Sequence, residues 1–136
     1  MHTLKTKGLD GHTYVWNLAE YHNKQNTNPS SHHVRCRELL LQIYINDVIL
    51  EEVTLPDVNL KLDFYLSRQF LAIEVQGEAH YQYVGHFHKH RIGYAGALKR
   101  DSTKREWCEL NRITLIELPH YEDNEKWKQR IIHRQT

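Results

Sequence analysis

Two acidic residues, Asp63 and Glu74, have a spacing that could place them at one site. The surrounding sequence predicts two short strands, 61–66 and 71–76, joined by a polar turn at 67–69. Because the two acids lie about equally far from the turn, an antiparallel hairpin would bring their Cβ atoms to roughly 4.5–5.5 Å. Carboxylates at that distance repel each other, and a hard divalent cation would bind both. The alternative is a solvent-facing hairpin whose acids have no chemical role.

The order of motifs around this pair resembles the PD-(D/E)XK nuclease superfamily. Asp63 is followed, after ten residues, by Glu74–Val75–Gln76, where the superfamily has (D/E)-x-K. IEVQGEAHY (73–81) and RDSTKREWCELNRITLIEL (100–118) are similar to the very-short-patch mismatch repair endonucleases and related small phage and bacterial nucleases. The resemblance covers about residues 31 to 118.

The resemblance implies an α/β (α+β) fold with a restriction-endonuclease-like core, in which a mixed β-sheet with a central hairpin is flanked by helices. It also implies an Mg²⁺-dependent DNA endonuclease in which Mn²⁺ substitutes for Mg²⁺. The implied metal ligands are Asp63, Glu74, the Val75 carbonyl and Glu38, and the implied catalytic residues are Asp63, Glu74, Gln76, His80 and Lys104.

The third motif position carries Gln76 instead of the usual lysine. We expect Gln76 to orient the attacking water, while His80 acts as general acid or base or contacts the scissile phosphate. Lys104 or Lys99 could face the metal site and replace the missing lysine. Alternatively, Lys104 pairs with Asp101, one helical turn away.

Glu38 lies in a predicted helix over about 32–45, for which Ser30 or Ser31 is the expected N-cap. Cys36, Leu39, Leu40, Ile43 and Tyr44 form its apolar stripe. Glu38 sits beside that stripe, which favours a place near the metal site. The alternative is an ordinary solvated helical glutamate.

The histidine-rich stretch 77–98 fits neither helical nor strand periodicity, so we predict a long loop there. His86, His88 and His90 invite a zinc interpretation, but no thiolate pair stands nearby. The basic residues expected to neutralise DNA phosphates are Lys89, Arg91, Lys99, Arg100 and Arg105.

Elsewhere the sequence predicts an N-terminal arm over 1–30, with a short helix near 11–22, followed by the nuclease-like domain over 31–136. A strand at 48–53, a helix at 100–111, a strand at 113–118 and a helix at 121–133 complete the domain. In the last helix Trp127, Ile131 and Ile132 are expected to face the core.

Composition and net charge exclude or disfavour some classes of protein. A net charge of +1 over 136 residues disfavours a protein that coats nucleic acid through charge alone. The 2 cysteines form no CxxC pair, and no apolar run approaches the roughly 20 residues that span a bilayer. We therefore expect a cytoplasmic monomer or homodimer, for instance in a phage-infected bacterium. Two other interpretations stay open: a catalytically inactive DNA-binding module with a nuclease-like fold, and a zinc-bound structural protein.

Overall fold

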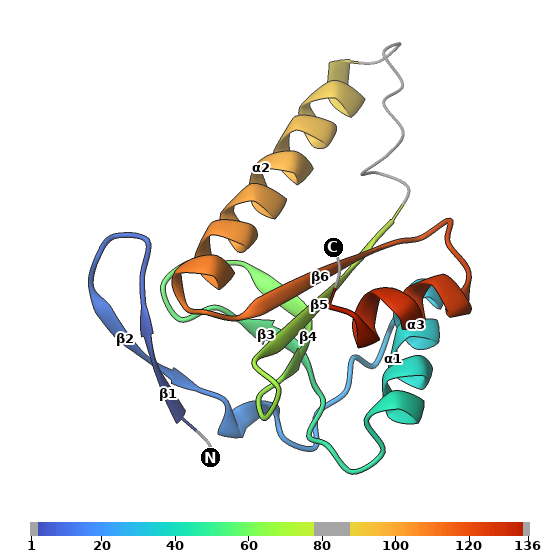
Figure 1. The fold of residues 1–136 in the computed structure, drawn as a ribbon. Helices are drawn as coiled ribbons and strands as arrows, with labels where there is room; N and C mark the ends of the chain where they lie inside the picture. Colours follow the sequence, from blue (N-terminus) through green and yellow to red (C-terminus); the bar gives the residue numbers. More distant parts are fainter. Residues whose placement is uncertain (1–2, 78–87, 135–136) are drawn as a thin grey trace.

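The chain forms a mixed α+β structure with two sheets and three α-helices in the computed structural model, which describes residues 3–77 and 88–134 (Figure 1). Of residues 88–95 and 97 it describes the backbone alone. The elements are β1 (Thr3–Lys7), β2 (Thr13–Asn17), a 3-10 turn (Ala19–Tyr21), α1 (Ser31–Ile43), β3 (Leu50–Thr54), β4 (Lys61–Leu66), β5 (Leu71–Gln76), α2 (His88–Leu110), β6 (Thr114–Pro119) and α3 (Asn124–Ile132).

The main sheet has the strand order β3-β4-β5-β6. Strands β3, β4 and β5 are antiparallel neighbours, whereas β6 runs parallel to β5 after the α2 crossover. The predicted α+β class and the run of three antiparallel strands are therefore confirmed. β3 lies slightly later than predicted, at 50–54 instead of 48–53.

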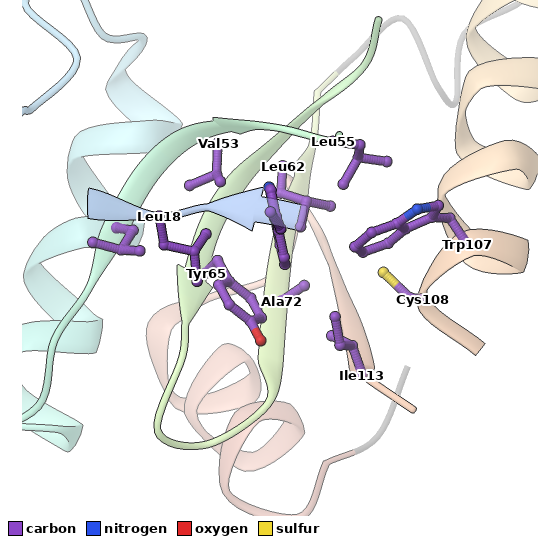
Figure 2. Packing of buried hydrophobic residues seen from close by; sticks show 11 residues of the cluster. Leu18, Val53, Leu55, Leu62, Tyr65, Ala72, Trp107, Cys108 and Ile113 are labelled. Atoms are coloured by element: carbon purple, nitrogen blue, oxygen red, sulfur yellow. The ribbon is translucent and has the colours of Figure 1, made fainter. Parts of the chain in front are cut away.

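Each face of this sheet carries its own hydrophobic core. One cluster joins Leu40 of α1 and Trp127 of α3 to Phe64 and Ile73 of the sheet. The other joins Tyr65 of the sheet to residues of α2 and of the N-terminal segment. In Figure 2, Trp107 and Cys108 of α2 point toward Leu62 and Ile113. Helices α1 and α3 thus cover one face, and the C-terminal part of α2 covers the other.

The N-terminal segment is a β-hairpin, so the helix predicted near 11–22 is wrong. Strands β1 and β2 pair antiparallel as a separate sheet. In β2, Trp16 is buried while Val15 is exposed, which is the period-2 pattern of a strand. The Trp16 ring packs edge-on against Trp107, with ring centroids 5.0 Å apart, and its Nε1–H donates to the Thr54 carbonyl at 2.8 Å.

The predicted loop over 77–98 is also wrong in part, because α2 begins at His88. Residues 78–87 lie outside the described residues, so the rest of that prediction is untested. Ala95, Ala97, Leu98 and the flanking basic residues are good helix formers, and they outweigh the penalty of the two glycines in this stretch. The helix predicted at 100–111 is therefore the C-terminal part of a longer one, and Asp101 and Ser102 lie inside α2.

The two other helices begin at side-chain caps. The Ser30 hydroxyl accepts a hydrogen bond from the His33 amide at 3.1 Å, as predicted, although α1 ends at Ile43. Asp123 caps α3, in which Trp127 and Ile131 are buried but Ile132 is 46% exposed, contrary to expectation. No helix within the described ranges has the length and apolar character needed to cross a membrane.

Candidate functional site

The β4–β5 ladder changes character where Asp63 and Glu74 face each other. Regular pairing ends at Phe64 opposite Ile73, and the same register places Asp63 opposite Glu74. There the Asp63 amide donates to Glu74 Oε2 at 2.6 Å, and the Val75 amide donates to Asp63 Oδ2 at 2.8 Å. Each carboxylate therefore accepts a hydrogen bond from the opposite strand's backbone, which holds the two acids side by side.

Lys104 reaches this point from α2. Its Nζ lies 2.5 Å from Glu74 Oε1, where Glu74 is buried and Lys104 is half-buried. Of the two alternatives for Lys104, the structure favours the one in which it faces the acids. Asp101 is one turn earlier and also raises the pKa of Lys104, but as a smaller contribution than Glu74.

The acids outnumber the lysine at this point. Burial, and then the neighbouring Asp63 charge, raise the pKa of Glu74 to about 8. Burial likewise raises the pKa of Asp63, although the Val75 amide and Lys104 oppose the change. Both shifts have the same origin, because two carboxylates are withdrawn from water with a single ammonium between them.

Strands β3 and β4 are both irregular at the same place. Glu52 of β3 would face Asp63 in the register that pairs Glu51 with Phe64 and Val53 with Leu62. Glu52 has a φ of 52°, which only a few per cent of non-glycine residues adopt. In β4, Leu62 and Phe64 lie in the cores on opposite faces, although a regular strand would put them on one face. The irregularity turns Glu52 and Asp63 toward the same space.

That space lies beneath the start of α1. One ligand atom from each of His33, Glu52 and Asp63 lies within 4.8 Å of the other two, an arrangement that could hold a metal ion. The same three residues line a pocket of about 260 Å³. The predicted partner of Asp63, Glu74, is not in this group, because its oxygens accept from Lys104 and from the Asp63 amide. Asp63 thus faces α1, while Glu74 faces α2.

His33 is oriented by a second buried acid. Its ring stacks on Phe64 with centroids 4.3 Å apart, and its Nε2 lies 2.9 Å from Glu51 Oε1. Arg37 donates to both oxygens of Glu51, each at 2.8 Å. Burial raises the pKa of Glu51, but hydrogen bonds from Arg37 and His33 outweigh burial and hold it below the ordinary value.

Two further histidines lie near the mouth of the pocket. His32 lines it, and the His32 ring lies 5.4 Å from that of His120, between centroids. The His120 amide donates to the Gln76 carbonyl at 3.0 Å, which places His120 beside the end of β5.

The structure does not bring every predicted residue to Asp63. Glu38 is exposed on α1, so the residue of this helix that faces the acids is His33. The Gln76 amide donates to Glu117 of β6, and Glu117 in turn pairs with Arg105 at 2.6 Å. Gln76 and Arg105 therefore share Glu117 as a partner. Val75 lines the pocket, and the metal-binding role of its carbonyl stays a prediction.

The remaining predicted residues divide into two groups. Lys99 and Arg100 are exposed on α2, where they are accessible to a large ligand. His80 lies outside the described residues, and Lys89 and Arg91 belong to α2 with side chains that are not described.

Sequence reasoning missed His33 and Glu52. The usable signal was the pair Glu51–Glu52 inside the predicted strand 48–53, because acids are depleted in strands. The histidines at the start of the predicted helix 32–45 gave no such signal, because which one faces the sheet depends on the packing of α1.

Three viral proteins are similar to part of the chain. "Uncharacterized protein 307L" of Invertebrate iridescent virus 6 is 39% identical over 62 residues, and "Uncharacterized protein 094L" of Frog virus 3 is 43% identical over 68 residues. "Uncharacterized protein 033L" of Invertebrate iridescent virus 3 is 32% identical over 62 residues.

These matches cover 46–48% of this chain and 32–44% of the relatives, so the chain spans less than half the length of each protein. No protein-family model matches the chain, and no solved structure does. The three relatives are not phage proteins, so the expected phage setting gains no support from them.

Proposed function

We propose that this chain is a metal-dependent nuclease that hydrolyses phosphodiester bonds in DNA. The observation that carries the proposal is the exchange of hydrogen bonds between Asp63 and the Glu74–Val75 segment, with Lys104 held 2.5 Å from Glu74. This places two acids and one lysine at the end of a hairpin. The motif order over residues 31–118, which resembles the PD-(D/E)XK superfamily, supports the same chemistry.

The excess of negative charge is the physical reason to include a cation. Asp63 and Glu74 share one ammonium, so the buried cluster carries a net negative charge when both acids are ionised. Asp63 faces the pocket and would hold the divalent ion. Such an ion, when bound, polarises a phosphodiester group and lowers the pKa of a water molecule.

Lys104 takes the role that the third motif position has in the resembled superfamily. Glu74 fixes its Nζ, so the positive charge is already in place before a substrate binds. A preorganised ammonium stabilises negative charge that develops on the phosphate oxygens. Glu74 therefore acts as a positioning residue for Lys104.

Proton transfer is assigned to His32. It lines the pocket and has His120 as its neighbour, with ring centroids 5.4 Å apart. Imidazole is the side chain that most often transfers protons in catalysis. This role was predicted for His80, which lies outside the described residues.

DNA is the proposed substrate because exposed basic residues lie on a helix that leaves the sheet. Helix α2 extends well beyond the main sheet, and Lys99 and Arg100 are exposed on it (Figure 1). Each phosphate contact releases counterions, so binding is expected to weaken as the salt concentration rises.

Cleavage of supercoiled plasmid with Mn²⁺ or Mg²⁺ tests the proposal. We expect nicked product from the wild type and a loss of rate of about 10³-fold in Asp63→Asn, comparable to removing a group that stabilises a transition state. Glu38→Gln, on the exposed side of α1, is the matched control and keeps the wild-type rate.

Equal rates for the wild type and Asp63→Asn would refute the proposal. A band shift without relaxation, unchanged by either metal, would instead identify an inactive DNA-binding module.

A further inference from the structure

We infer that His33, Glu52 and Asp63 form a divalent-metal site that prefers Mn²⁺ and other borderline cations to Mg²⁺. The inference deepens the proposed function, on which it rests for the role of the ion in hydrolysis. The metal site itself depends only on the geometry and donor chemistry of these three residues.

Three elements converge to form this site. His33 comes from α1, Glu52 from β3 and Asp63 from β4, and their ligand atoms lie within 4.8 Å of one another. Bonds of about 2.0–2.2 Å to one ion place two ligands roughly 3 to 4.4 Å apart. Because ligands on one side of an ion lie near the lower end of this range, side-chain movements on the order of 1 Å close the set around a cation.

The imidazole presents the correct nitrogen. Glu51, which Arg37 keeps ionised, is a hydrogen-bond acceptor 2.9 Å from His33 Nε2, so in the neutral imidazole that donates to it the lone pair lies on Nδ1. Nδ1 lies 4.0 Å from Glu52 Oε1, too far for a hydrogen bond but suitable for two ligands of one ion. A carboxylate behind a histidine is the usual arrangement of a metal ligand.

The carboxylates keep free ligand positions. Within the described residues, Glu52 accepts one hydrogen bond, from the Asn26 side-chain amide (Nδ2) to Oε1 at 3.0 Å. Asp63 accepts one, from the Val75 amide to Oδ2 at 2.8 Å. Each acid thus retains a second oxygen, and the pocket of about 260 Å³ leaves room for water or a phosphate group beside them.

The donor set determines the preferred metal. Mg²⁺ selects oxygen ligands and keeps most of its water, whereas imidazole suits Mn²⁺ and the later first-row metals. One nitrogen and two carboxylates, on one side of an open pocket, match an ion that binds three protein ligands and retains open positions. We therefore infer Mn²⁺ as the preferred ion at this site, where the sequence predicted Mg²⁺ with Mn²⁺ as a substitute.

Titration of the full, chelator-treated chain with Mn²⁺ tests the site. Electron paramagnetic resonance of the free Mn²⁺ monitors the titration. We expect a single strong site whose electron spin echo carries nitrogen coupling. His33→Asn should remove that coupling and weaken Mn²⁺ binding at least about tenfold, with a much smaller effect on Mg²⁺ competition. Glu52→Gln, on a partly exposed side chain, should weaken both metals without affecting folding.

Two controls separate this site from others. His32→Asn changes a neighbouring histidine that lines the pocket outside the ligand group, and Glu38→Gln changes an exposed acid of the same helix. Both should bind Mn²⁺ as the wild type does. Thermal unfolding followed by circular dichroism checks that His33→Asn is folded.

The inference is overturned if His33→Asn and Glu52→Gln bind Mn²⁺ as tightly as the wild type, or if Mg²⁺ binds as tightly as Mn²⁺. Mn²⁺ binding that depends on these residues, without DNA cleavage, would reject the nuclease and retain the site. Cleavage that depends on Asp63 but not on His33 would retain the nuclease and reject the site.

Discussion

Glu51 on β3 and Glu74 on β5 are both buried glutamates in the same sheet, but their surroundings differ in charge. Glu51 accepts hydrogen bonds from Arg37, His33 and the Asn26 amide, and the pKa of Glu51 falls. Glu74 shares Lys104 with Asp63, and the pKa of Glu74 rises to about 8. The first carboxylate is fully compensated by the protein, whereas the second pair is not.

The difference indicates a structural role for one cluster and a functional role for the other. A buried acid with complete partners stabilises the fold and orients His33. A pair of buried acids with too little positive charge lowers stability, which proteins tolerate mainly at functional sites. His33 joins the two clusters, because one of its nitrogens is bound to Glu51 and the other faces the pocket.

The largest expected effect on stability comes from breaking the compensated cluster. Glu51→Gln should lower the free energy of unfolding by about 3 kcal/mol, because Arg37 loses its bidentate partner and the new amide faces donors. Urea denaturation measures it. The adjacent Glu52→Gln is the matched control, and it should cost less than about 1 kcal/mol since Glu52 is partly exposed. Equal losses in the two variants would show that the hydrogen bonds to Glu51 contribute no more to stability than those of its partly exposed neighbour Glu52.

Lys104→Met tests the undercompensated cluster. We expect a loss of about 2 kcal/mol, because Glu74 and Asp63 then have no ammonium between them. In the double variant Lys104→Met with Glu74→Gln, the loss of unfolding free energy should be smaller than the sum of the two single losses by about 1 kcal/mol or more. Lys99→Met, on the exposed part of α2, should change stability by less than about 0.5 kcal/mol. Additive losses in the double variant would show that Lys104 and Glu74 act independently.

The fold was largely predictable because the strands of its main sheet have clear local sequence signals. The segments around Asp63 and Glu74 alternate between apolar and polar residues, contain β-branched and aromatic residues, and flank a polar turn. The sequence therefore predicted that the two segments pair as a hairpin. The two largest errors, the helix near 11–22 and the loop over 77–98, arose where tertiary contacts determine the structure. Trp16 sits in a polar segment whose strand structure depends on packing against Trp107, and α2 extends across glycines that locally favour a loop.

The candidate site was predictable only in part. Asp63, Glu74 and Lys104 could be found because motif order and hairpin register are properties of the sequence. His33 and Glu52 could not, since they meet Asp63 through a helix packed on the sheet and through a backbone irregularity at Glu52, where φ is 52°. Local periodicity would place Glu52 on the face opposite its neighbours and gives no indication of this change.

Asp63→Asn should have a smaller effect on stability, of the opposite sign. The variant removes a charge that burial and the neighbouring Glu52 disfavour, while the asparagine oxygen still accepts from the Val75 amide. We expect the metal-free variant to be about 1 kcal/mol more stable than the wild type at neutral pH, as seen in thermal unfolding. Added Mn²⁺ should then stabilise the wild type and leave the variant unchanged. A destabilised metal-free variant would contradict the charge imbalance on which the comparison depends.

The smallest effect is expected at Glu122, whose pairing near the surface provides a reference for both buried clusters. Arg130 donates to both Glu122 oxygens, at 2.6 and 2.7 Å, and these hydrogen bonds lower the pKa of Glu122. The unfolded carboxyl therefore takes up its proton at a higher pH than the folded one. The stabilisation is present above the ordinary glutamate pKa and is lost as the pH falls through the lower, folded value. Glu122→Gln should thus cost about 0.5 kcal/mol at pH 7 and almost nothing near pH 3, as measured by urea denaturation at both values. An undiminished difference at the lower pH would mean that packing of the side chain, and not its charge, accounts for the contribution of Glu122.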